Sequence, residues 1–598
     1  MGLLSALNYP FDSAQVLRKR KVWRRTLLET KGSWLEKKIA ILGGASTQDI
    51  VTTLDVFLLN EGIKASFYES DYGRFQEDAI FGNPKLDTFA PDLVIIHTTN
   101  RNIREFPLVL DSIVQVEEKI DREFQRWKSI WEQVNKRYQC AIIQNNFDPP
   151  IYRILGNRDA ISPTGGAAFI NALNERFYKW SREHSYFFIH DIHHRASDYG
   201  LQRWHDIATW HLYKYAMNVQ AIPDFCYSLA TIIRALWGKS KKCLALDLDN
   251  TLWGGIIGDD GVEGISLGPE TASGAAYQEF QSYIKHMSEL GIVLCINSKN
   301  DETNALAGLK HPHSLLSPED FAIIKANWEP KDHNLVEMAQ ALELGVDSFV
   351  FVDDNPVERG LVLSSLPQVA VPPLDRVENY IQLIDRSAYF ESVNLTDEDK
   401  IRGKMYTANA KRKEEEHSFI DYGSYLASLD MRAHISCFTQ ERLPRITQLT
   451  NKTNQFNLTT QRYTETEMQA LMNDPQAVCL CGTLADKYGD NGLVSVMAGK
   501  IEGDICYIVL WLMSCRVLKR NLEQAMMNTF IEQCSKKPEV KYIYGKYIPT
   551  VKNTMVKDLY KNLGFNFHKE EYDGITEWEM DITQYIPHIT YIKIENLL

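Results

Sequence analysis

Short apolar runs alternate with helical stretches from Lys38 to Val371, and this alternation limits the possible folds more than any other feature of the chain. The runs are KKIAILGG, IKASFYES, DLVIIHTT and CAIIQNN, followed after residue 240 by KKCLALD, GIVLCINS, FAIIKA, SFVFVDD and QVAV. Continuous apolar strands between helices are typical of parallel sheets that helices cover on both faces. The pattern therefore predicts two α/β domains, over residues 36–236 and 240–376.

The remaining segments follow different patterns. Residues 1–35 form a leader in which Ser13 to Leu28 reads as a basic amphipathic helix, either with a solvated face or with a face that docks an acidic partner. Residues 377–419 are polar and end in a run of mixed charges, which favours a helical linker. Residues 420–598 mix strands and helices in an order that predicts an α+β domain.

Composition excludes several classes of protein. The 598 residues include 65 basic and 78 acidic side chains, a net charge of −13, which argues against a general binder of nucleic acid or anionic membranes. No apolar run is long enough to span a bilayer, and the first ten residues do not resemble a signal peptide. The ten cysteines form no CxxC pair, which argues against a disulfide scaffold or a structural zinc site. We therefore expect a soluble, cytoplasmic, multidomain protein.

The sequence DLDNT places two carboxylates at the end of an apolar strand. Asp247 and Asp249 lie two residues apart there, and open α/β sheets carry their sites at such strand ends. One carboxylate can attack an electrophile and hold a divalent cation, while the other protonates the leaving group and later activates water. This pair indicates phosphoryl transfer.

The other groups that phosphoryl transfer needs follow later in the chain. Ser298 ends a strand and can donate to a phosphate oxygen, and Lys331 can neutralise developing charge. Asp353 and Asp354 end a further strand, where Mg²⁺ would find oxygen ligands. A phosphorylated small molecule is the substrate class that this set favours.

The constellation resembles the haloacid dehalogenase (HAD) superfamily over residues 241–374. The resemblance implies that Asp247 is the nucleophile and Asp249 the general acid and base. It further implies a phosphate site formed by Ser298, Lys331 and Thr251. The Mg²⁺ site that it implies is formed by Asp247, the backbone carbonyl of Asp249, Asp353 and Asp354.

Four sequence segments are similar to the FkbH-like subgroup: LDLDNTLWGGIIGDDG, NSKND, NWEPKDHN and FVDDNPVERG. The sequence also predicts that no cap domain is inserted after Thr251. That resemblance implies transfer of a glyceryl unit from 1,3-bisphosphoglycerate to the phosphopantetheine thiol of an acyl carrier protein, for polyketide-type products. A plain phosphatase acting on a small phosphate ester and a non-enzymatic scaffold are the alternatives. Many relatives have a cysteine where this chain has Asn297; Cys295 could replace it as an acyl carrier, or be inert packing.

The flanking domains carry weaker resemblances. The first resembles SGNH-type hydrolases with a flavodoxin-like sheet. The resemblance implies that Ser46 is a nucleophile, Asn100 an oxyanion-hole donor and either His205 or His211 the catalytic histidine. The GDS motif and an aspartate three residues before the histidine are missing, so a degenerate, structural or docking domain is favoured.

The last domain looks like a GNAT acyltransferase fold, in which the loop after ICYIVLWLMS would bind coenzyme A. Here Lys519 and Asn521 stand where glycines are expected, so acetyl transfer is not favoured. Arg516, Lys519 and Arg520 could still contact a phosphopantetheine arm, or the domain could be purely structural.

Overall fold

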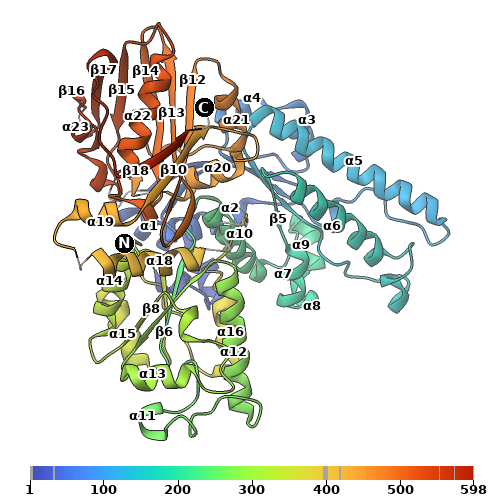
Figure 1. Cartoon of the computed structure of the whole chain (residues 1–598). Helices are drawn as coiled ribbons and strands as arrows, with labels where there is room; N and C mark the ends of the chain where they lie inside the picture. The colour runs from blue at the N-terminus through green and yellow to red at the C-terminus, as the bar shows by residue number, and fades with distance from the viewer. Residues whose placement is uncertain are drawn as a thin grey trace. The chain divides into compact units, whose positions relative to one another are not determined.

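The computed structural model describes residues 4–30, 34–394, 402–416, 419–453, 455–550, 552–571 and 573–596 (Figure 1). The chain divides into two compact units. One comprises Met1–Arg234 with Thr464–Thr466, and the other Ala235–Tyr463 with Glu467–Leu598. No helix among the described residues has the length and apolarity required to cross a membrane.

The first unit contains a five-stranded parallel sheet. Its strands are β1 (Leu35–Gly43), β2 (Ile63–Glu69), β3 (Leu93–His97), β4 (Ala141–Asn145) and β5 (Phe187–His190), in the order β2-β1-β3-β4-β5. This is the order of flavodoxin-like sheets, as the sequence predicted. The carboxyl ends of β1 and β3 meet where the strand order reverses.

Helices follow each strand of this sheet. They are α2 (Gln48–Asn60), α3 (Phe75–Phe81), α4 (Pro84–Phe89), α5 (Ile113–Tyr138), α6 (Gly166–Glu183), α7 (Ile192–Tyr199), α8 (Leu201–Trp204), α9 (Ile207–Tyr213) and α10 (Ile222–Leu236). The long amphipathic helix α5 buries Trp127 and Trp131, which pack with Phe177 of α6. Burial of these large rings accounts for much of the apolar core.

The leader helix α1 (Ser13–Glu29) is the predicted one, but its basic face is used within the chain. Arg20 forms an ion pair with Asp49, and Arg24 lies 2.5 Å from Asp55, both acids being on α2. Because these guanidiniums already have intramolecular partners, the face is neither wholly solvated nor fully available to an acidic partner.

Two buried histidines at strand ends predict an acid-sensitive first domain. His97 ends β3 and His190 ends β5, both are 0 % exposed, and both rings contact Phe225, at 5.1 and 4.7 Å between centroids. Burial lowers the pKa of His97 to about 4 and that of His190 to about 3. Since the unfolded chain binds these protons near pH 6.5, stability is fully present above that pH and is lost as pH falls, by about 3 kcal/mol per histidine down to pH 4.

We expect His97→Gln to remove about 3 kcal/mol of this pH-dependent loss, because glutamine does not titrate. Urea unfolding of the full chain at pH 7, 5.5 and 4.5, followed by tryptophan fluorescence, measures the effect. His211→Gln, at an exposed position of α9, is the matched control. An unchanged pH dependence in His97→Gln would contradict the prediction.

The second unit begins with a four-stranded parallel sheet. Its strands are β6 (Cys243–Leu246), β7 (Val293–Ser298), β8 (Ile323–Ala326) and β9 (Phe349–Val352), in the Rossmann-like order β8-β7-β6-β9. The predicted strand QVAV is wrong: among the described residues it forms an isolated bridge between Ala370 and Val350. Pro372 and Pro373 follow directly, and proline cannot continue the ladder of hydrogen bonds.

Six helices accompany this sheet in the described residues: α11 (Ile257–Asp260), α12 (Ala272–Glu289), α13 (Glu302–Leu309), α14 (Lys331–Ala341), α15 (Pro356–Ser365) and α16 (Val377–Arg386). The connection between Thr251 and α12 holds one turn of helix, α11, so it adds no cap domain.

The predicted linker is helical but packed. Helix α16 buries Tyr380 and Ile384 in the core under α12, and α18 (Arg402–Glu416) buries Tyr406. Arg412 of α18 pairs with Asp486 at 2.7 Å. Helices α16 and α18 therefore pack within the second unit and do not form a solvent-exposed linker. Residues 395–401 and 417–418 of the predicted linker lie outside the described residues.

The last region has the predicted α+β organisation. Its mixed sheet has the order β16-β17-β15-β14-β13-β12-β10-β18, with β11 paired to β14. The strands are β10 (Met431–Cys437), β11 (Phe456–Asn457), β12 (Ala477–Asp486), β13 (Gly489–Glu502), β14 (Ile505–Met513), β15 (Tyr542–Tyr547), β16 (Asn566–Glu570), β17 (Thr576–Asp581) and β18 (Ile592–Asn596). The helices are α19 (Tyr422–Ser428), α20 (Leu443–Lys452), α21 (Glu465–Asn473), α22 (Leu522–Ser535) and α23 (Leu559–Asn562).

Candidate active site

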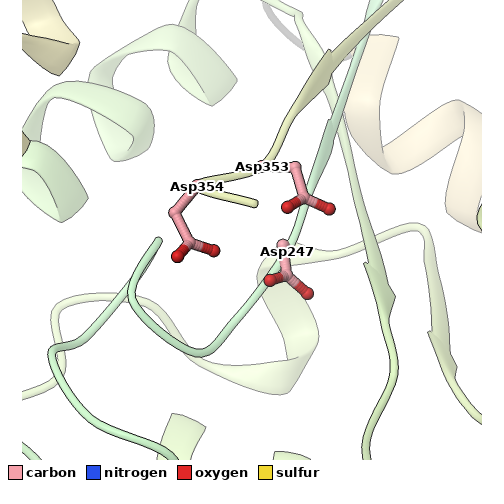
Figure 2. A group of neighbouring side chains, drawn as sticks. All are labelled: Asp247, Asp353 and Asp354. Atoms are coloured by element: carbon pink, nitrogen blue, oxygen red, sulfur yellow. The ribbon is translucent and has the colours of Figure 1, made fainter. Parts of the chain in front are cut away.

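Three carboxylates meet at the carboxyl ends of β6 and β9. Leu246 pairs with Val352 in the sheet, so Asp247 and Asp353, the next residues, lie side by side, and Asp354 follows (Figure 2). One carboxylate oxygen from each lies within 4.8 Å of the others. The strand order reverses at this point, which is where open α/β sheets bind their ligands. The structure thus brings together three residues that the sequence analysis gave as Mg²⁺ ligands.

Lys331 joins two of the carboxylates. It is the first residue of α14 and is 3 % exposed, and its Nζ lies 2.9 Å from Asp247 Oδ1 and 2.5 Å from Asp353 Oδ2. Burial opposes its charge, but the carboxylates of Asp247 and Asp353 more than offset that effect and raise the pKa of Lys331. A permanent cation therefore lies beside the predicted nucleophile.

The site holds more negative charge than Lys331 can balance. Burial, together with repulsion from Asp247, raises the pKa of Asp353 to about 6, and the same two causes raise the pKa of Asp354. Clustered, partly buried carboxylates of this kind are the ligands that a hard divalent cation prefers. The donor set in this structure therefore fits Mg²⁺.

Asp249 is directed away from this group. Its Oδ1 accepts hydrogen bonds from Trp253 Nε1 at 2.8 Å and from the Ile257 amide at 3.1 Å, and its Oδ2 accepts one from Asn300 Nδ2 at 3.0 Å. Burial raises the pKa of the Asp249 carboxyl. A carboxyl that gains a proton more readily is suited to general acid and base work, and its direction leaves the backbone carbonyl as its expected contact with a cation.

The two predicted phosphate-binding hydroxyls are both buried. Ser298 ends β7 and is 2 % exposed. Thr251 is 0 % exposed, and its Oγ1 accepts a hydrogen bond from the Asp354 amide at 3.2 Å. Thr251 thus positions Asp354, a role that the sequence did not indicate, and its contact with phosphate stays a prediction.

A chain of asparagines holds Lys331 in place. Asn297 Nδ2 donates to the Lys331 carbonyl at 2.9 Å, and Asn334 Nδ2 donates to Asn297 Oδ1 at 3.1 Å and to Asn327 Oδ1 at 2.9 Å. Asn297, the departure from the cysteine of many relatives, therefore anchors the start of α14. The sequence signal for this role was a polar residue, Asn297, that directly follows the apolar part of β7.

Cys295 lies deeper on the same strand. It is 0 % exposed, accepts a hydrogen bond from Cys243 Sγ at 3.6 Å and packs in an apolar cluster with Leu335 and Met338. This enclosure is the environment of an inert thiol. Of the two interpretations left open by the sequence, packing is the one that the structure favours.

Asn300 should matter for turnover because it fixes Asp249. We expect Asn300→Leu to lower kcat about 10–100-fold with little change in KM, as loss of a residue that orients a reactive group does. Asn379→Leu, whose amide bonds the surface carboxylate of Asp375, is the control. Steady-state kinetics with a chromogenic phosphate ester measures both; equal kcat values would contradict the role.

The residues predicted for an SGNH-type site are only partly brought together. Ser46 Oγ donates to the Tyr213 carbonyl at 2.5 Å, and no hydrogen bond among the described residues joins it to His205 or His211. His205 instead lies 3.6 Å from Asp148 Oδ2, and His211 is exposed on α9.

Asp148 is the partner that sequence reasoning missed. It is wholly buried, which raises its pKa, and it comes from the loop after β4. The Asn100 amide, predicted to serve an oxyanion, donates to the Asp148 and Pro149 carbonyls at 3.1 Å each. A serine hydroxyl committed to a backbone carbonyl is consistent with the favoured degenerate or structural role.

The loop predicted to contact a phosphopantetheine arm packs against other residues of the second unit. Lys519 and Asn521 adopt φ values of 60° and 63°, so the backbone keeps a conformation that usually requires glycine. Arg520 is buried and contacts Asp486 at 3.2 Å and Asn409 at 3.1 Å. Its guanidinium already balances a buried carboxylate, which argues against the predicted contact with a phosphopantetheine arm.

The space beside β14 is also filled. Strand β11 pairs with β14 through Phe456 and Asn457, the Leu458 amide donates to the Trp511 carbonyl at 3.1 Å, and the Ile548 amide donates to the Leu458 carbonyl at 2.9 Å. Residues 456–458 thus bond to β14 and to the segment after β15. An extended arm could occupy this position only by displacing them.

Comparison with known proteins found similarities over parts of the chain. Residues 38–234 match the sequence model of the family described as FkbH, N-terminal domain. The chain is also similar to a solved structure, the N-terminal part of protein BF1531 from Bacteroides fragilis, described as containing a phosphatase domain complexed with Mg. The two are 29% identical with a TM-score of 0.58, over 63% of this chain and 99% of that one.

Two acetyltransferase structures match a smaller part of the chain. The ribosomal-protein-S18-alanine N-acetyltransferase from Escherichia coli is 13% identical over 26% of this chain and 98% of its own, with a TM-score of 0.21. Spermidine N-acetyltransferase from Vibrio cholerae is 12% identical over the same shares, also with a TM-score of 0.21. A comparison with curated protein sequences found no match.

Proposed function

We propose that the chain is a Mg²⁺-dependent phosphohydrolase or phosphotransferase that uses Asp247 as its nucleophile. The observation that carries the proposal is the group of Asp247, Asp353 and Asp354 with Lys331 between the first two. The similarity to a Mg-bound phosphatase domain, at 29% identity, supports it.

The first step forms a bond from an Asp247 oxygen to phosphorus and breaks the bond from phosphorus to the leaving oxygen. Asp249 gives its proton to that oxygen, which its raised pKa favours. Lys331 holds the attacking carboxylate in place and balances the charge that spreads over the phosphoryl oxygens. A bound Mg²⁺, held by Asp247, Asp353, Asp354 and the Asp249 carbonyl, would neutralise phosphoryl charge.

The second step frees Asp247. Asp249, now ionised, takes a proton from water, the water oxygen bonds to phosphorus, and the bond from phosphorus to Asp247 breaks. Inorganic phosphate leaves, and both aspartates return to their starting states. The contacts of Asp249 with Trp253 and Asn300 keep its carboxyl oriented through both steps.

The experiment is phosphate release from acetyl phosphate and p-nitrophenyl phosphate by the full chain. We expect release with Mg²⁺ and loss of release when the metal is chelated. If neither these probes nor a broad panel of phosphorylated small molecules yields phosphate with Mg²⁺, the phosphohydrolase proposal fails and a non-enzymatic scaffold is favoured.

A finer function is transfer of an acyl group, such as glyceryl, from an acyl phosphate to a carrier-protein thiol. The match of residues 38–234 to the FkbH N-terminal domain model supports it. The uncapped site does too, because Ile256, Trp328 and Val357 are exposed on the segments that follow β6, β8 and β9. In this reaction the thiolate sulfur bonds to the acyl carbon while the bond from that carbon to the phosphate oxygen breaks. The cytoplasmic location of such a reaction stays a prediction.

Intact mass spectrometry tests the transfer. The full chain is incubated with Mg²⁺, 1,3-bisphosphoglycerate generated in place and phosphopantetheinylated acyl carrier proteins. A glyceryl or phosphoglyceryl adduct on a carrier supports acyl transfer. Phosphate release without any adduct restricts the function to a phosphatase acting on a small molecule.

A further inference from the structure

A cavity of about 310 Å³ lies in the second unit, away from the candidate active site. It is bounded by residues that precede β6 and β9, namely Lys242, residues 343–345, Asp347 and Ser348. Tyr406 of α18, Lys452 of α20 and residues 514–516 after β14 complete this part of the lining. Asp247 follows the other end of β6. The four residues of β6, Cys243–Leu246, separate Lys242 from Asp247, and the five steps between these two residues span roughly 16 Å at about 3.3 Å per residue.

The lining of this cavity is basic although the chain is acidic. Five cationic side chains face two acidic ones: Lys242, Arg445, Lys452, Arg516 and Lys552 against Glu343 and Asp347. Lys552 and Asp347 form an ion pair at 2.5 Å. Cationic side chains therefore outnumber acidic ones in the lining, in a chain whose net charge is −13.

Arg516 is the residue that points to a ligand. It is 5 % exposed, and its guanidinium bonds to Ser514 Oγ at 3.1 Å and to the thioether of Met405. Within the part of the chain that the structure describes, no carboxylate forms an ion pair with it. A buried guanidinium whose partners are a hydroxyl and a thioether lacks the anion that normally offsets loss of hydration.

We propose that this cavity binds the phosphate group of a small metabolite, with Arg516 as its main ligand. A guanidinium presents paired donors that match phosphate oxygens, and the neighbouring lysines add charge. The volume suits a phosphate ester of a few carbon atoms better than a nucleotide. The inference goes beyond the proposed function, because it holds whether or not Asp247 is a nucleophile.

Titration calorimetry on the full chain tests the proposal without Mg²⁺, using inorganic phosphate and glycerol phosphate as separate probes. We expect one site that persists in Lys331→Met, which disables phosphate binding near Asp247, and that weakens about tenfold or more in Arg516→Met. Arg376→Met, at an exposed arginine, is the control and should bind as the wild type does. Preference for either probe shows whether free phosphate or an ester is the ligand.

A second measurement keeps the test decisive if Arg516→Met does not fold. Cys515 lines the cavity and is half-buried, whereas Cys437 is exposed elsewhere. Bound phosphate should slow alkylation of Cys515 relative to Cys437, and Lys452→Met should weaken both this protection and the calorimetric affinity several-fold. Loss of all binding in a Lys331→Met protein that circular dichroism shows to be folded, wild-type affinity in Lys452→Met, or no binding to the wild type would overturn the proposal.

Discussion

Asp247→Asn should abolish Mg²⁺-dependent phosphate release, with kcat reduced about 10⁴–10⁶-fold, the scale seen when a catalytic nucleophile is removed. The amide cannot attack phosphorus and is a poorer ligand for a cation. It also removes a carboxylate that lies 2.9 Å from Lys331 Nζ. Phosphate release from acetyl phosphate by purified variants measures the effect.

The matched control is Asp259→Asn, an exposed aspartate of α11 on the connection that follows Asp247. It should turn over acetyl phosphate as the wild type does. Because Asp247→Asn removes one of two repelling carboxylates, its thermal stability should not fall. Residual activity within about tenfold of the wild type in a folded Asp247→Asn protein would rule out Asp247 as nucleophile.

Lys331→Met should both inactivate and destabilise the protein. It leaves the buried carboxylates of Asp247 and Asp353 without their shared cation, and breaking such a buried pair costs about 3–5 kcal/mol. Part of that cost should return when Mg²⁺ is added, since a divalent cation can replace the missing charge. We therefore expect Mg²⁺ to raise the Tm of the variant more than that of the wild type.

Thermal unfolding with and without Mg²⁺ measures this difference. Lys325→Met, which breaks a pair with Glu337 where both side chains are about a third or more exposed, is the control and should change Tm little. A Lys331→Met variant that loses no stability, or that gains none from Mg²⁺, would contradict this prediction. It would show that Lys331 and Mg²⁺ do not neutralise the same carboxylates.

The reacting groups of the candidate site could be predicted from the sequence because each stands at the end of its own strand. Parallel strands bring their carboxyl ends to one edge, so Asp247 after β6 and Asp353 after β9 must meet. Lys331 lies at the start of a helix after β8 and reaches the same edge. No side-chain detail was needed for that conclusion.

The residues that hold those groups could not be predicted in the same way. Asn300, Asn334 and Thr251 act through hydrogen bonds whose partners depend on side-chain direction. The pairing of His205 with Asp148 likewise joins segments far apart in the sequence. Pattern reasoning assigns residues to strands and loops, but it does not say which buried polar groups will satisfy one another.

The same limit explains the errors about charged segments. The sequence of α18 is rich in charge and predicts a helical linker, yet Met405 and Tyr406 are buried and Arg412 pairs with Asp486. Arg520 was expected to face a ligand and instead completes the same internal cluster. In both cases a partner distant in sequence determines where the cation lies.

Phosphorylation of Asp247 is the most direct test of the account. In Asp249→Asn the first step can still proceed with acetyl phosphate, whose leaving group needs no proton, but the second step lacks its base. After incubation with Mg²⁺ and acetyl phosphate, the peptide that contains Asp247 should carry one phosphoryl group, removable by hydroxylamine. Phosphate release by the wild type with no phosphoryl group ever found on Asp247 in this variant would contradict the account.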